Sequence, residues 1–122
     1  MKNLFIFILF VFFSFSSISQ EVKNDILSVQ NFNELVLGRD VQLVDVRTKK
    51  EFDSGKIEGA INIDYFEKDN FITVFEKLNK NQPVYLYCRS GRRSQASAIL
   101  LENMGFKEIY DLKGGFIAWT KK

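Results

Sequence analysis

The chain has 122 residues, with 17 Lys and Arg against 15 Asp and Glu, no His and a single Cys. Without histidine, a Cys–His or Ser–His catalytic pair and a histidine-ligated metal are excluded, and one cysteine excludes an internal disulfide and a CxxC redox pair. A formal net charge of +2 predicts neither a nucleic-acid-binding stripe nor a membrane-surface patch.

Residues 1–19 have the pattern of a secretory signal peptide. A basic start at Lys2 precedes an apolar run from Leu4 to Phe15 and a small, polar segment from Ser16 to Ser19. The run is short for a permanent membrane span, so cleavage before Gln20 is expected, and an uncleaved N-terminal anchor is the alternative. Cleavage leaves about 103 residues, which is the size of one compact domain.

The rest of the chain alternates between strand and helix patterns. Residues 20–24 are polar and are expected to be frayed. Apolar runs predict strands at 25–28, 41–46, 59–63, 83–87 and 109–111. Helical spacing predicts helices around 32–36, 48–54, 71–78, 94–104 and 115–119, the fourth burying Ala98, Ile99, Leu101 and Met104. This alternation predicts a single α/β domain with a mainly parallel sheet covered on both faces.

Cys88 stands where the fourth strand pattern meets the fourth helix pattern, heading the segment Cys88-Arg89-Ser90-Gly91-Arg92-Arg93-Ser94. A lone cysteine after a buried strand is most often a small apolar core residue. Core packing, however, requires neither the glycine nor the three arginines that follow within five residues. A tight loop and a helix N-terminus direct backbone N–H groups toward an anion, and the helix dipole favours negative charge. We therefore predict a thiolate held beside a small anionic ligand.

Four segments together resemble the rhodanese (sulfurtransferase) family, and they span roughly residues 25–121. They are Val44–Arg47 with Glu51–Phe52, Gly55–Ile63, the Cys88 loop and Leu112–Trp119. The resemblance implies an α/β fold with about five parallel strands flanked by helices on both faces. The architecture resembles that of the small, exported, single-domain rhodaneses of Gram-negative bacteria, so a periplasmic location is expected.

The resemblance also implies a reaction. Cys88 matches the family nucleophile, whose thiolate takes the outer sulfur of a donor such as thiosulfate and passes it from a persulfide to a thiophilic acceptor. Backbone N–H groups from Arg89 to Ser94 would line the bowl around the sulfur, without a metal or organic cofactor. Arg89 resembles the basic residue of thiosulfate-using members, whereas Arg92 and Arg93 either attract the anion or are surface charges. Asp45 and Arg47 are expected to support the site as an ion pair or cap.

Two other functions stay open at this point. Phosphatases of this fold, and arsenate reductases, are disfavoured because the phosphatase loop is one residue longer and ends in an arginine, where this chain has Ser94. A non-catalytic sulfur carrier or binding module is the main alternative, although such modules usually lose the cysteine. The expected partners are a small anionic sulfur donor and a thiophilic acceptor, with no nucleic acid and no membrane after signal cleavage. The sequence predicts no oligomeric state and names no physiological donor or acceptor.

Overall fold

The computed structural model describes residues 8, 10–12, 14 and 21–122. Most of the expected signal peptide, residues 1–19, and its cleavage site lie outside these residues, so export stays a prediction. Within the described part of the chain, no helix is long and apolar enough to cross a membrane.

Five parallel strands form one sheet in the order β1-β5-β4-β2-β3. The central strand β4 is buried along its whole length, as its run of Val, Tyr and Leu predicts for a strand covered on both faces. The expected α/β fold with about five strands is therefore confirmed. The strands are β1 (Lys23–Leu27), β2 (Gln42–Asp45), β3 (Ile61–Asn62), β4 (Val84–Tyr87) and β5 (Glu108–Leu112).

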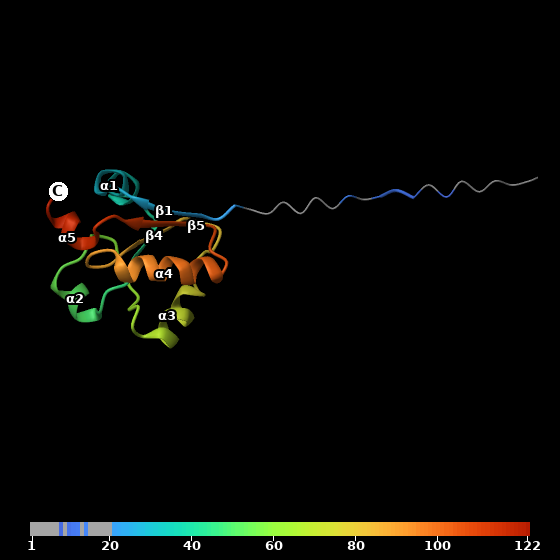
Figure 1. The fold of residues 1–122 in the computed structure, drawn as a ribbon. Coiled ribbons are helices and arrows are strands. Elements are labelled where there is room, and N and C mark those ends of the chain that lie inside the picture. Colours follow the sequence, from blue (N-terminus) through green and yellow to red (C-terminus); the bar gives the residue numbers. More distant parts are fainter. Residues whose placement is uncertain (1–7, 9, 13, 15–20) are drawn as a thin grey trace, which may run out of the picture.

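Helices cover both faces of the sheet. α1 and α5 lie on one face, and α3 and α4 lie on the other (Figure 1). Each face has its own apolar core: one includes Phe32 of α1 and Tyr85 of β4, and the other includes Leu86 of β4 and Leu101 of α4. The helices are α1 (Val29–Val36), α2 (Lys49–Ser54), α3 (Lys68–Phe75), α4 (Arg92–Asn103) and α5 (Gly115–Thr120).

Two expectations about α4 were wrong. The helix begins at Arg92 rather than Ser94, because Gly91 takes a left-handed conformation (φ 112°) as the N-cap and the arginines that follow are good helix formers. Ile99, expected in the core, is 60% exposed, since the buried face of α4 consists of Ser94, Ser97, Ala98 and Leu101. The buried serines replace apolar residues at the end of the helix nearest Cys88.

Two expected strand boundaries also differ. Lys23 and Asn24, expected to be frayed, belong to β1 because they pair with Glu108 and Ile109 of β5. Only two residues of the expected strand 59–63 pair with the sheet, at its far edge. Both differences arise from backbone pairing with a distant strand, which an apolar pattern does not reveal.

Candidate active site

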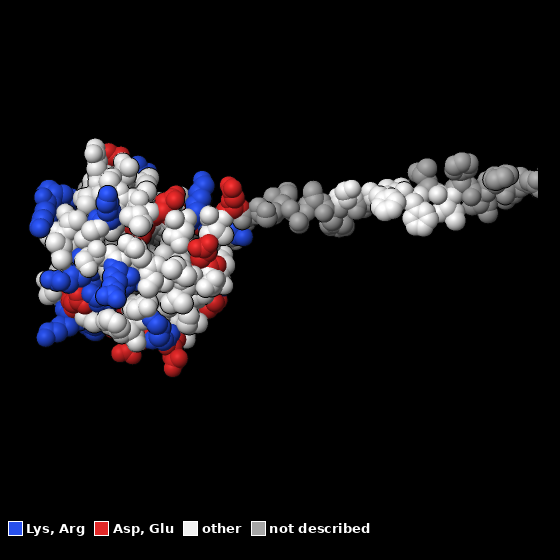
Figure 2. All heavy atoms as spheres, viewed as in Figure 1, with Lys and Arg blue, Asp and Glu red and all other residues white. Residues whose placement is uncertain are grey.

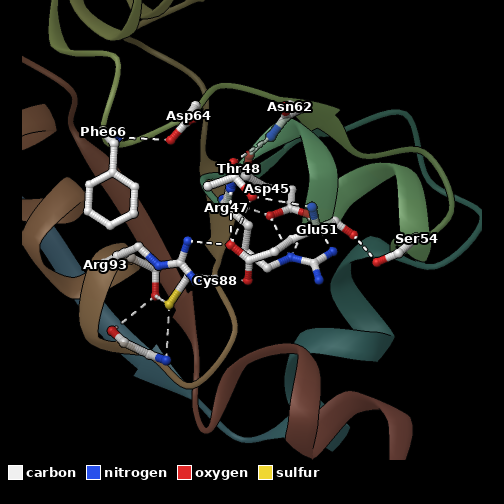
Figure 3. A network of polar contacts seen from close by, with 12 residues as sticks. Asp45, Arg47, Thr48, Glu51, Ser54, Asn62, Asp64, Phe66, Cys88 and Arg93 are labelled. Atoms are coloured by element: carbon white, nitrogen blue, oxygen red, sulfur yellow. Dashed lines mark hydrogen bonds and ion pairs between the residues drawn. The ribbon is translucent and has the colours of Figure 1, made fainter.

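Cys88 directly follows β4, at the carboxyl edge of the parallel sheet, where ligands bind in open α/β folds. Its side chain is buried, with an exposed fraction of 1%. The Gly91 N–H donates to the sulfur at 3.0 Å, and the Ser94 hydroxyl lies 3.4 Å from it. Of the described backbone amides from Arg89 to Ser94, only that of Gly91 reaches the sulfur as a donor, while Figure 3 shows Arg93 beside it. The Gly91 N–H is thus a fixed donor to the sulfur, whereas the Ser94 hydroxyl, with one proton, also lies 3.1 Å from the Gly91 carbonyl oxygen.

The Cys88 loop is held from behind by the start of α5. The N–H of Phe116 donates to the Cys88 carbonyl at 2.8 Å, and the N–H of Ile117 donates to the Arg89 carbonyl at 3.1 Å. Gly115 allows this close approach, because a Cβ at this position would lie 2.6 Å from the Arg89 and Cys88 carbonyl oxygens. The first amides of α5 therefore position the loop that carries the cysteine.

The expected ion pair between Asp45 and Arg47 is present and buried. The two side chains meet at 2.7 Å through Arg47 Nη2, with exposed fractions of 0% and 4% for the residues. Arg47 also donates to the Gly55 carbonyl at 2.6 Å and lies 4.3 Å from the Phe116 ring centre. These contacts link three segments, namely β2, the loop that follows α2, and α5. The ion pair therefore supports the edge of the sheet around the cysteine.

Arg93 is held by Glu51, a residue that sequence reasoning did not assign to the site. Two hydrogen bonds of 2.7 and 2.9 Å join the guanidinium to the carboxylate, as Figure 3 shows. The bond from Arg93 lowers the pKa of Glu51 to about 2, although partial burial acts in the opposite direction. Glu51 also caps α2 with Thr48, a Thr-x-x-Glu pattern that the sequence does display. The ion pair between Glu51 and Arg93 joins residues 42 positions apart, and no local sequence pattern predicts it.

A pocket of about 440 Å³ lies against the outer side of the loop. The exposed residues Arg89, Ser90 and Arg92 and the half-buried Arg93 line it, and Phe66 and Tyr65, which no sequence pattern marked, form its aromatic wall. Phe66 is 63% exposed, so its ring is accessible at this pocket. In Figure 2, Lys and Arg are prominent on the side of the molecule where α2, α5 and the start of α4 lie. The site thus combines a buried sulfur with an exposed cationic pocket on the outer side of the same loop, called the mouth below, whose charge suits an anionic substrate.

Comparison with known families agrees with this geometry. The sequence profile of the rhodanese-like domain matches residues 28–122. The chain belongs to the rhodanese-like domain family. A solved rhodanese-like domain protein from Staphylococcus aureus has the same fold, with a TM-score of 0.67 and 31% identity over 78% of this chain and 90% of that one.

Named relatives of this rhodanese-like chain differ in function. It is 33% identical to the thiosulfate sulfurtransferase GlpE of Shewanella oneidensis over 76% of this chain and 89% of the relative. It is 30% identical to the tRNA uridine(34) hydroxylase of Pelagibacter ubique over 84% of this chain, but spans only 34% of that protein. The first similarity is therefore to nearly a whole protein, and the second to one part of a larger one.

Proposed function

We propose that this rhodanese-like protein is a sulfurtransferase that moves a sulfane sulfur from thiosulfate, or a similar donor, to a thiophilic acceptor through a persulfide on Cys88. The observation that carries the proposal is the buried Cys88 sulfur with donors from Gly91 and Ser94, next to a mouth lined by Arg89 and Arg92. Similarity to a named thiosulfate sulfurtransferase over most of both chains supports it.

The reaction has two displacement steps. The Cys88 thiolate attacks the outer sulfur of thiosulfate, a new S–S bond forms, and the old S–S bond breaks so that sulfite leaves with the electron pair. The outer sulfur of the persulfide is then attacked by the acceptor, which restores the thiolate. Charge balances in each step, so no proton donor, metal or organic cofactor takes part. The Gly91 N–H is placed to stabilise negative charge on the sulfur throughout.

The arginines divide between two tasks. Arg93 is engaged by Glu51, so it orders the start of α4 rather than clamping a substrate. Arg89 and Arg92 are exposed at the mouth and attract the anionic donor. A phosphatase would need a guanidinium directed at the phosphoryl oxygens above the sulfur, and Ser94 occupies the end of this loop. The arrangement thus favours sulfur transfer over phosphoryl transfer.

Steady-state kinetics with thiosulfate and cyanide test the proposal. Because a persulfide divides the reaction into two halves, we expect double-reciprocal plots with parallel lines, and no turnover by Cys88→Ser. Hydrolysis of an aryl phosphate without thiosulfate consumption would overturn the assignment. A protein that gains sulfur but shows no turnover with cyanide or a thiol would instead be a sulfur-carrier module.

A further inference from the structure

Asp111 is a buried carboxyl group that the proposed reaction does not use. It lies on β5 with an exposed fraction of 1%, and its strand neighbours in register are Ile26 and Leu86. Ile109, two residues earlier on the same face of the strand, belongs to the core beneath α4. Within the described part of the chain, neither carboxyl oxygen of Asp111 has a hydrogen-bond partner. Such a group is costly to bury, so its position calls for an explanation.

The Ser94 hydroxyl lies between this carboxyl group and the Cys88 sulfur. Ser94 is fully buried at the start of α4, and its oxygen is 3.4 Å from Cys88 Sγ and 3.1 Å from the Gly91 carbonyl oxygen. The hydroxyl and the Leu112 amide are close enough to lower the pKa of Asp111, but neither meets it in hydrogen-bond geometry. A hydroxyl has one proton, so Ser94 can donate to only one of the Gly91 carbonyl, the Cys88 sulfur and Asp111 at a time.

The surroundings of Asp111 allow it to change protonation state near neutral pH. Burial raises its pKa to about 7, with the nearby Ser94 hydroxyl and Leu112 amide acting in the opposite direction. Asp111 also lines an open pocket of about 650 Å³ between β1 and α4, through which a proton can reach solvent. The charged groups at this pocket are Glu21, Lys23, Asp25 and Glu102. Cys88 follows Leu86, the register partner of Asp111 on β4, by two residues.

We propose that Asp111 is a positioning residue for Cys88, and that its protonation state decides, through the Ser94 hydroxyl, whether the sulfur keeps its second hydrogen-bond donor. When Asp111 is protonated, its O–H donates to the Ser94 oxygen, and the Ser94 proton is directed to the sulfur. When Asp111 loses its proton to water, Ser94 turns to donate to the carboxylate. The sulfur then keeps only the hydrogen bond from the Gly91 N–H, and the Asp111 carboxylate adds a negative charge nearby. The proposal rests on the proposed function only in taking Cys88 as the reacting group.

An absorbance titration of the Cys88 thiolate across the pH range in which Asp111 changes charge tests the coupling between the two groups without any sulfur transfer. We expect a broad, two-step rise in the wild-type protein, because two interacting groups share the titration. Asp111→Asn keeps a donor toward Ser94 and cannot ionise, so its thiolate should form in a single step at lower pH. A shift of one pH unit corresponds to about tenfold more thiolate at a given pH on the rising part of the curve. Asp25→Asn removes an exposed carboxylate at the same pocket and should titrate like the wild type.

Identical titrations for the wild type and folded Asp111→Asn would overturn the proposal. A second measurement needs no change at Asp111: carbon-13 NMR of the aspartate carboxyl groups in the wild type and in Cys88→Ser. Because linkage is reciprocal, loss of the thiolate must move the Asp111 titration to lower pH. An unchanged Asp111 midpoint in Cys88→Ser would also overturn it. Neither experiment uses a sulfur donor, so both test only the coupling between Asp111 and Cys88. The proposed sulfurtransferase function is tested separately, by the kinetic assay with thiosulfate and cyanide.

Discussion

The Arg93 guanidinium and the Glu51 carboxylate join α4 to α2 beside the reactive sulfur. Both side chains are partly exposed, by 18% and 28%, so water weakens their attraction but does not remove it. The Phe66 ring centre lies 5.4 Å from the same guanidinium, which places the aromatic wall of the mouth against this ion pair. Glu51 thus fixes Arg93 in the wall of the mouth and leaves Arg89 and Arg92 exposed there.

Replacing Glu51 by Gln should therefore destabilise the protein at neutral pH by about 1–2 kcal/mol, because a charged, bidentate pair becomes a weaker contact. Since the folded pKa of Glu51 is about 2, below the ordinary 4.5, its contribution is complete above pH 4.5 and is lost as the pH falls toward 2. Urea unfolding of both proteins at pH 7 and pH 3 should show the difference shrinking at the lower pH. Glu34→Gln, at an exposed position on α1, is the matched control; an equal effect of both substitutions would contradict this account.

The start of α5 and the Cys88 loop form one unit, although 26 residues separate Cys88 from Gly114. Amides of Phe116 and Ile117 bind the loop carbonyls, and Gly115 leaves room for that contact. A Cβ at Gly115 would lie 2.6 Å from backbone atoms of the loop, which have no freedom to move aside separately. The double glycine before α5 is therefore part of the site even though neither residue touches the sulfur.

Gly115→Ala should lose both stability and reactivity. The left-handed φ of 62° costs an alanine about 1–2 kcal/mol, and the clash with the loop adds to that cost and displaces Cys88. Gly38→Ala is a matched control, since Gly38 has φ 68° but no heavy atom within 4 Å of its added Cβ. We expect thermal unfolding to show the larger loss for Gly115→Ala, and sulfur loading of Cys88 to fall in that variant alone. Equal loading by both variants would show that α5 does not position the loop.

The alternation of strands and helices was predictable because each buried strand is a short apolar run with helical spacing on either side. The position of Cys88 at the sheet edge followed from the same pattern. The partners that complete the site come from distant segments. Glu51 meets Arg93, and Asp111 comes to lie beside Leu86 of β4, only after the sheet and helices have packed, so no local spacing marks either position. Ile99 is the opposite case: its helical spacing predicted burial, but the packing of α4 leaves its side chain exposed to solvent.

The account depends most on Cys88 carrying a transferable sulfur, and intact mass spectrometry after incubation with thiosulfate measures this directly. The single cysteine makes the result unambiguous: we expect a gain of about 32 Da, as a persulfide requires, that is reversed by cyanide. Cys88→Ser should gain nothing. If the reduced, folded protein gained no mass with thiosulfate, the proposed donor and the first step of the mechanism would both be contradicted.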